Sequence, residues 1–245
     1  MEIIFNEYKG LIRVGRITYI KGRPIHPRYE GFTPIVVLTK CSEYGDIGPY
    51  VLKDKDNIIM ENKWQFSKVY PWVPEIEQTY SKWDNTIIWK HPKERHMDGD
   101  ILNDKYWEWR KKGFEALHAI RYPVGNTTHK KMCKYVLSDD GRKLGIYEGR
   151  RDVYLKTYVE LVKKESKFKQ LKKRLQNYEN LLIIEVDGPH QESLSYYKDT
   201  YEVNDDFIEN DTILVTMKNM DIMIKDPKHS FGHGYCLAMA LMGWE

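Results

Sequence analysis

Three polar side chains in one short segment have the types and spacing to act together on a flat, polar ligand. Glu61, Gln65 and Lys68 lie in MENKWQFSKVY, residues 60–70, directly before Pro71. Proline cannot continue a helix, and the segment itself contains no Gly or Pro, so it is predicted to form a helix of about three turns. The i, i+4, i+7 spacing then places the three side chains on one stripe.

The surroundings of this stripe leave two interpretations open. Trp64 and Val69 flank it, so a carboxylate, an amide and an ammonium would lie beside an indole and could bind a polar ring. The same spacing is typical of an ordinary solvated helix face, on which neighbouring charges pair only weakly.

The segment resembles the central motif of the NADAR (YbiA-like) superfamily, E-x-x-[WY]-Q-x-x-K, with Glu61, Trp64, Gln65 and Lys68 at the motif positions. Other pieces of the family pattern follow in family order from about Leu38 to the C-terminus. They are Leu38-Thr39-Lys40, an expected strand at Tyr50-Val51-Leu52, Lys167-Phe168, the run Asn177 to Leu181, the strand end Glu185-Val186-Asp187, and a Gly-rich turn running from Gly232 to Met242.

The chain also departs from the family pattern. Asn62 stands where the family usually has His, and Lys40 stands at an upstream Asn position. Tyr235 and Ala238 replace the Asn and Gly expected in the final turn. We expect a single domain with an N-terminal extension over about residues 1–33 and an elaboration near 194–223, because those regions match no part of the pattern.

The resemblance implies an α+β, helix-rich single domain with a small β-sheet, and an N-glycosidase activity that hydrolyses a ribose C1–nitrogen bond. The implied substrates are an ADP-ribosylated base or nucleic acid, or a phosphoribosylamino-pyrimidine, and no metal or other cofactor is expected. The implied catalytic residues are Glu61, Lys68 and Asp187, and the implied substrate-binding residues are Trp64, Gln65, Lys40, Asn62, Gly232 and Gly234. Because of the departures, a non-catalytic module that binds a nucleotide, ADP-ribose or nucleic acid is the alternative.

Composition sets the broad class of the protein. Of 245 residues, 41% are apolar and 31% charged, which is typical of a folded chain rather than a disordered one. A net charge of +3 permits an anionic ligand without demanding nucleic acid. Three widely spaced cysteines outside any CxxC pattern indicate neither a disulfide framework nor a zinc site. With no signal-like N-terminus and no apolar run of membrane-spanning length, we expect a cytoplasmic protein with no membrane partner, its oligomeric state left open.

Hydrophobic patterns predict the remaining elements. The predicted strands are Leu11–Ile20, half-buried, Pro34–Leu38, Leu181–Val186 and Thr212–Thr216, with a loop over 21–31. One predicted helix starts at Asp98 or Asp100 and runs to about Ile120. The other predicted helices are Lys130–Leu137, Arg150–Gln176 with a break at Ser166, Lys218–Ile224 and Tyr235–Met242.

Two polar features of the chain have competing interpretations. Many lysines lie on one face of the helical pattern at residues 150–176. They indicate either an ordinary solvated face or a surface that binds the phosphates of a nucleic acid. His91 and His96 have a spacing that fits no helical or strand-face pair of metal ligands, so satisfied or solvated histidines are expected there.

Overall fold

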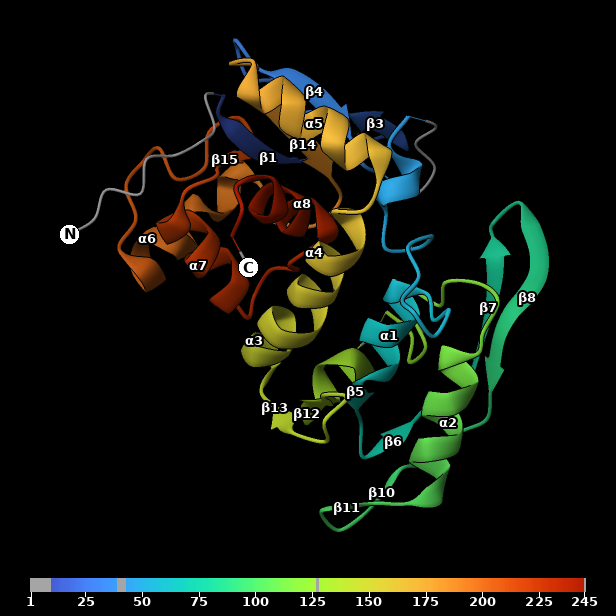
Figure 1. The fold of residues 1–245 in the computed structure, drawn as a ribbon. Helices are drawn as coiled ribbons and strands as arrows, with labels where there is room; N and C mark the ends of the chain where they lie inside the picture. Colours follow the sequence, from blue (N-terminus) through green and yellow to red (C-terminus); the bar gives the residue numbers. More distant parts are fainter. Residues whose placement is uncertain (1–9, 39–42, 127, 245) are drawn as a thin grey trace. The chain divides into compact units, whose positions relative to one another are not determined.

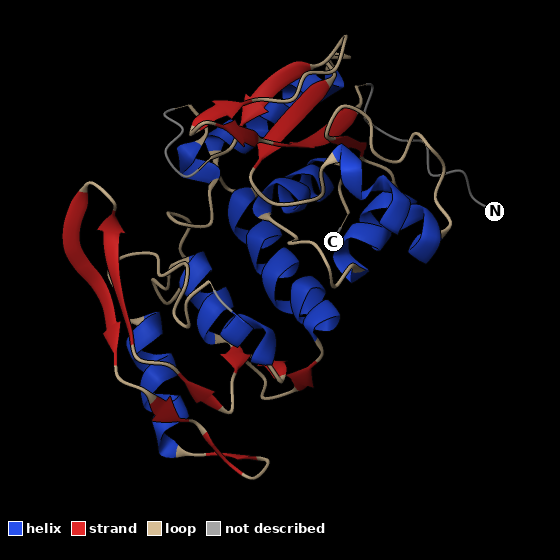
Figure 2. Ribbon diagram, turned by 180° about the vertical axis from the view of Figure 1, so that it is seen from behind, coloured by secondary structure: helices blue, strands red, loops and turns tan. Residues whose placement is uncertain are grey.

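The computed structural model describes residues 10–38, 43–126 and 128–244, which form two compact units (Figure 1). Unit 1 combines the described residues up to Gly48 with those from Tyr158 onward, and unit 2 runs from Pro49 to Thr157. Each unit contains both helices and strands (Figure 2), which confirms the predicted α+β class.

Unit 1 is built on a four-stranded sheet in the order β15 (Thr212–Leu214), β1 (Ile12–Arg16), β14 (Leu181–Glu185) and β4 (Thr33–Val36). β14 runs parallel to both β1 and β4, while β15 is antiparallel to β1. Every residue of β14 is buried, as the aliphatic run in its sequence predicts for an inner strand. A hairpin of β2 (Thr18–Ile20) and β3 (Arg23–Ile25) follows β1, so the predicted strand Leu11–Ile20 is divided in two, and β3 lies where the sequence predicted a loop.

The helices of unit 1 differ in how much of their surface they bury. α8 (His233–Leu241) is buried on almost every side and contacts β1 and β14, because nearly all of its side chains are apolar or small. α5 (Ser166–Gln176) buries Phe168, Leu171 and Leu175 and exposes lysines on its other side. The other helical elements are η1 (Gly45–Ile47), α4 (Lys156–Val162), η4 (Gln191–Ser193), α6 (Leu194–Tyr201) and α7 (Met217–Lys225).

Unit 2 packs short elements around an aromatic core. Phe66 lies between Trp89 and Trp109, and Gly113 allows this close approach because a Cβ atom there would lie 2.2 Å from the Phe66 ring. The helical elements are α1 (Met60–Phe66), α2 (Asp104–Phe114), η2 (Thr128–Met132), α3 (Ile146–Gly149) and a π-helical turn, η3 (Arg150–Leu155). The strands are β5 (Lys68–Val69), β6 (Trp72–Val73), β7 (Ile76–Ser81), β8 (Asp84–His91), β9 (Glu94–Arg95), β10 (Met97–Asp98), β11 (Ile101–Leu102), β12 (Tyr135–Leu137) and β13 (Lys143–Leu144).

Several predictions of the bounds and types of elements in unit 2 were wrong. α2 begins later than expected because Asn103, rather than Asp98 or Asp100, caps it by accepting from the backbone N–H of Tyr106. The helix ends at Phe114, and Leu117, expected on its apolar side, is 89% exposed. Residues 130–137 contain the end of η2 and the strand β12 instead of one helix. Residues 50 and 51 form a turn, and Leu52 belongs to no strand.

Both regions that match no part of the family pattern belong to the framework of unit 1. β1 lies within residues 1–33 and occupies an inner position of the sheet, between β15 and β14. Residues 194–223 supply α6, β15 and most of α7. The predicted break at Ser166 is confirmed, because α4 ends at Val162 and α5 begins at Ser166. The organisation as a single family domain stays a prediction.

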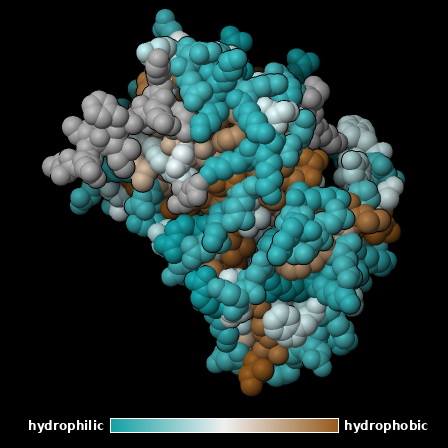
Figure 3. Space-filling model, in the orientation of Figure 1, coloured by the Kyte–Doolittle hydropathy of each residue, from teal (hydrophilic) through white to brown (hydrophobic). Residues whose placement is uncertain are grey.

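The surface in the view of Figure 3 is mostly hydrophilic. A small apolar area lies at the β10–β11 hairpin, where Ile101 is 75% exposed. Within the described part of the chain, no helix has both the length and the apolar character that crossing a membrane requires.

Candidate functional site

The helix that carries the motif is short and anchored by the chain before it. The backbone N–H groups of Met60 and Glu61 donate to the carbonyls of Leu52 and Pro49, at 2.9 Å each. α1 ends at Phe66 after two turns instead of the predicted three. Lys68 and Val69 form β5 because they pair with β12, which buries Val69 completely. The motif therefore spans a helix and the strand that follows it.

The side chains of Glu61, Gln65 and Lys68 form one hydrogen-bonded row across this junction. The Gln65 Nε2 group donates to Glu61 Oε1 at 2.8 Å, and Lys68 Nζ donates to Gln65 Oε1 at 2.9 Å. The Lys68 ammonium also lies 4.4 Å from the centre of the Trp64 ring, within the range of a cation–π contact. The solvated-face interpretation does not fit this arrangement, because only 5% of the Glu61 surface is exposed and the other three side chains are half-buried.

Burial changes the acidity of Lys68. The side chain keeps some contact with solvent, yet enough protein surrounds the ammonium that burial lowers the pKa of Lys68 to about 8. The charges of Cys133 and Glu61 oppose this shift, whereas the cationic Arg150 adds to it. Lys68 is therefore mostly protonated at neutral pH and gives up its proton far more readily than an ordinary lysine.

The neighbourhood of the row includes an irregular helix. Trp64 packs against Val136, Leu144 and Val153, and its ring lies 5.1 Å from that of Tyr154. Tyr154 belongs to η3, the π-helical turn that begins at Arg150. Isolated π-helical turns are rare and occur often at functional sites.

Asn62, expected to bind substrate, is fully buried and holds a loop of unit 2 in place. Its Oδ1 atom accepts from the backbone N–H of Ile120 at 2.7 Å, and its Nδ2 group donates to the carbonyl of His118 at 2.9 Å. A structural role therefore accounts for an amide at this position, and substrate binding by Asn62 stays a prediction.

In unit 1, three predicted site residues lie together around an acid that sequence reasoning did not select. Glu185 ends β14 fully buried, and its carboxyl group accepts from the backbone N–H groups of Asp187 at 3.1 Å and Gly234 at 2.7 Å. A Cβ atom on Gly232 would lie 2.4 Å from Glu185 Oε1 and 2.7 Å from Asp187 Oδ2. Glycine at this position therefore allows the backbone to pack closely against the two carboxyl groups, and binding of substrate by Gly232 and Gly234 stays a prediction. The sequence signal that could have identified Glu185 was its position as a charged residue at the end of the apolar run LLIIE.

A histidine completes this acidic cluster. His233 Nε2 lies 2.6 Å from the carbonyl of Val37, which can only accept, so Nε2 carries a proton. Its Nδ1 atom lies 3.1 Å from Glu185 Oε2. One proton must therefore be shared between Nδ1 and the carboxyl group. Burial raises the pKa of Glu185, while the charge of His233 opposes that rise.

The predicted site residues are thus divided between the units. Glu61, Asn62, Trp64, Gln65 and Lys68 belong to unit 2, whereas Asp187, Gly232 and Gly234 belong to unit 1. Lys40 lies outside the described residues. A single pocket shared by the two groups stays a prediction.

Unit 2 also contains a groove of about 600 Å³ beside α2. Its lining combines the half-exposed indole of Trp107 with Arg110 and Phe114, whose guanidinium and ring lie 4.9 Å apart. Lys53 and Lys111 add positive charge, whereas Asp56 and Glu115 add negative charge. Neither Glu61 nor Lys68 lines this groove.

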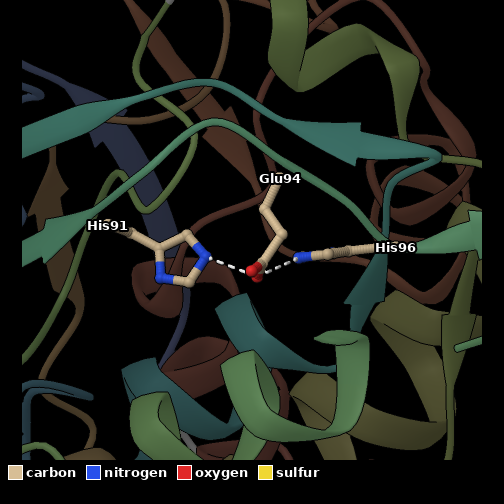
Figure 4. A group of neighbouring side chains, drawn as sticks. All are labelled: His91, Glu94 and His96. Carbon is tan, nitrogen blue, oxygen red and sulfur yellow. Dashed lines mark hydrogen bonds and ion pairs between the residues drawn. The ribbon is translucent and has the colours of Figure 1, made fainter. Parts of the chain in front are cut away.

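Histidine and carboxylate side chains with the chemistry of metal ligands meet in unit 2. His91, Glu94 and His96 each offer one ligand atom, and these atoms lie within 4.8 Å of one another (Figure 4). His91 and His96 are 7% and 0% exposed, so neither is a solvated histidine, whereas His91 Nε2 has a partner in Glu94 Oε2 at 3.0 Å, as expected of a satisfied one.

The comparisons with other proteins give no relative from which a function could be inferred. No family model, characterised protein or solved structure matches the chain.

We predict that Asn62→Ala lowers the free energy of unfolding by about 1–3 kcal/mol, because it leaves the buried Ile120 N–H without its acceptor. Urea denaturation measures the change, with the exposed Asn85→Ala as the control. Equal stability of the two variants would show that the Asn62 amide has no structural role.

Proposed function

We propose that the protein is an N-glycosidase that hydrolyses the bond between a ribose C1 and a nitrogen, in an ADP-ribosylated base or nucleic acid or in a phosphoribosylamino-pyrimidine. The YbiA-like fold and membership of the NADAR superfamily are part of this proposal. The observation that carries it is the hydrogen-bonded Glu61–Gln65–Lys68 row, which joins a buried carboxylate to an ammonium of lowered pKa.

Glu61 supplies the negative charge that this reaction requires. Cleavage of an N-glycosidic bond develops positive charge on C1 and the ring oxygen, and a fixed carboxylate nearby stabilises that charge. As water attacks C1, the same carboxylate accepts a proton from it. Burial strengthens both effects, because the surroundings of Glu61 contain little solvent to screen its charge.

Lys68 supplies the proton that the leaving nitrogen requires. An ammonium with a pKa of about 8 is a stronger acid than an ordinary lysine and is still mostly protonated at neutral pH. Only one of its three N–H groups is used by Gln65, so the others can donate to the departing base or to a phosphate. Trp64 offers a ring face for stacking against the base or ribose.

We predict that Glu61→Gln lowers turnover by about 100-fold or more, because glutamine keeps the size of glutamate and its ability to accept from Gln65 but carries no charge. The affinity for substrate changes far less, since the ground-state sugar carries no full positive charge. Steady-state kinetics on ADP-ribosylated DNA, with folding checked by circular dichroism, measures both quantities.

The matched control is Glu108→Gln, which removes an exposed carboxylate from the same unit and leaves turnover unchanged. Unchanged turnover in a folded Glu61→Gln protein would remove Glu61 from the mechanism.

The pKa of Lys68 predicts a pH dependence. The acid form of Lys68 is populated below pH 8 and is lost as pH rises through about 8, so kcat/KM falls across that range. Lys68→Arg keeps its proton at every accessible pH, so its lower activity shows no such fall. A wild-type profile that stays level up to about pH 10, where ordinary lysines titrate, would contradict the role of Lys68 as the acid.

The groove beside α2 supports a second candidate, a module that binds a nucleotide, ADP-ribose or nucleic acid without catalysis. Its aromatic and cationic lining suits a base and a phosphate and does not involve Glu61. For this candidate we predict that Trp107→Ala weakens the binding of ADP-ribose by at least about 5-fold, the lower end of the loss expected for one stacking contact, while Glu61→Gln binds normally. Fluorescence titration separates the candidates, since equal affinity of wild type and Trp107→Ala would exclude the groove.

A further inference from the structure

The residues His91, Glu94 and His96 are brought together by the strand ends of unit 2. His91 is the last residue of β8, Glu94 is the first residue of β9, and His96 lies between β9 and β10. Figure 4 shows the carboxylate of Glu94 between the two imidazole rings. The irregular connection through Pro92 and Lys93 produces this arrangement, which no regular helical or strand spacing would predict.

The distances fit one small cation. Glu94 Oε2 lies 3.0 Å from His91 Nε2 and 3.8 Å from His96 Nε2. Two ligand atoms on a tetrahedral zinc ion lie about 3.4 Å apart, as the usual zinc–ligand bond lengths require. Small rotations of the side chains would bring both separations to that value.

His96 is the residue that needs a partner. Its side chain is fully buried, and neither ring nitrogen has a hydrogen-bond partner among the described residues. Buried polar atoms almost always have partners, and each exception requires an explanation. A hydrogen bond between His91 and Glu94 accounts for those two residues but leaves His96 unexplained.

The three side chains are already held in position. The ring of His91 stacks on Trp89 with an interplanar angle of 13°, and the ring of His96 lies 5.1 Å from that of Trp109. The backbone of His96 donates to the carbonyl of Pro71 and accepts from Asn103. Such packing fixes ligand orientation before any ion arrives.

The charges around the cluster also suit a metal ion. Imidazole binds a metal ion through a ring nitrogen that carries no proton, and each of the two rings offers one nitrogen to the cluster. The positive charges of Lys112 and Lys105 act on His91 and oppose a cation. The carboxylate of Glu94 offsets them, which explains an acid among the three ligands.

We propose that His91, Glu94 and His96 bind one Zn²⁺ ion, which fastens the end of β8 to the segment between β9 and β10. Imidazole nitrogen and carboxylate oxygen are common zinc ligands, and three of them leave one position for water. This proposal departs from the expectation, implied by the family resemblance, that the protein needs no metal. The ion is independent of the proposed hydrolase, because none of its ligands belongs to the Glu61–Gln65–Lys68 row.

The test is Zn²⁺ titration by calorimetry on the full chain after chelator treatment, with Co²⁺ absorption as a second probe of coordination. We expect one Zn²⁺ per chain and a higher melting temperature when it is bound. Losing a residue that only orients a ligand lowers affinity about 10- to 100-fold, so losing a ligand in His91→Gln or Glu94→Gln should cost about 100-fold or more.

His118→Gln is the matched control, because it removes an exposed histidine of the same unit and should bind Zn²⁺ like the wild type. Glu94→Gln keeps the shape of a partly exposed side chain, so it remains informative if the His91 variant fails to fold. Absence of stoichiometric Zn²⁺ binding, or equal binding in the folded Glu94→Gln and His118→Gln variants, would overturn the proposal.

Discussion

The side-chain amide of Gln65 is the constraint on which the candidate site depends. A carboxylate can only accept hydrogen bonds and an ammonium can only donate them, so Glu61 and Lys68 together allow one orientation of the amide between them. Hydrogen bonds to charged groups contribute about 1.5–3 kcal/mol each, roughly twice the value for neutral pairs. Reversing the amide would lose both bonds, because the amide oxygen would face the Glu61 carboxylate and the amide N–H groups would face the Lys68 ammonium. The row is therefore ordered by its own charges before any substrate binds.

The framework of unit 2 holds both ends of this row in place. Phe66 at the end of α1 packs between the tryptophans of the core, and Val69 beside Lys68 is buried by pairing with β12. Asn62 fixes the neighbouring loop through two backbone hydrogen bonds. Burial that lowers the pKa of Lys68 is a consequence of the same packing. Charged groups on rigid elements with little surrounding solvent meet the main requirement for electrostatic catalysis, which is that they need not reorganise during the reaction.

Local patterns predicted the elements that depend on local sequence. The aliphatic runs at Leu181–Val186 and Pro34–Leu38 became inner and parallel-paired strands, and Ser166 divided the long helical pattern. The motif helix was predicted too long because β5 forms by pairing with β12, which is distant in the sequence. Spacing also could not place His91 beside His96, since the irregular connection between β8 and β9 brings them together. Glu185 was missed because an acid closing a strand is common in turns, and only the fold shows that its carboxyl group meets Gly234 and His233.

Product analysis shows whether the protein hydrolyses a ribose C1–nitrogen bond. Wild-type protein would be incubated with ADP-ribosylated DNA, and separately with a phosphoribosylamino-pyrimidine, in water enriched in ¹⁸O. Mass spectrometry would then measure the masses of the products. We expect hydrolysis of at least one of the two, which gives ADP-ribose and unmodified DNA, or a phosphoribose and a free amino-pyrimidine, with the heavy oxygen on ribose C1. Intact substrates from folded protein that still binds them would contradict hydrolysis at the Glu61–Gln65–Lys68 row.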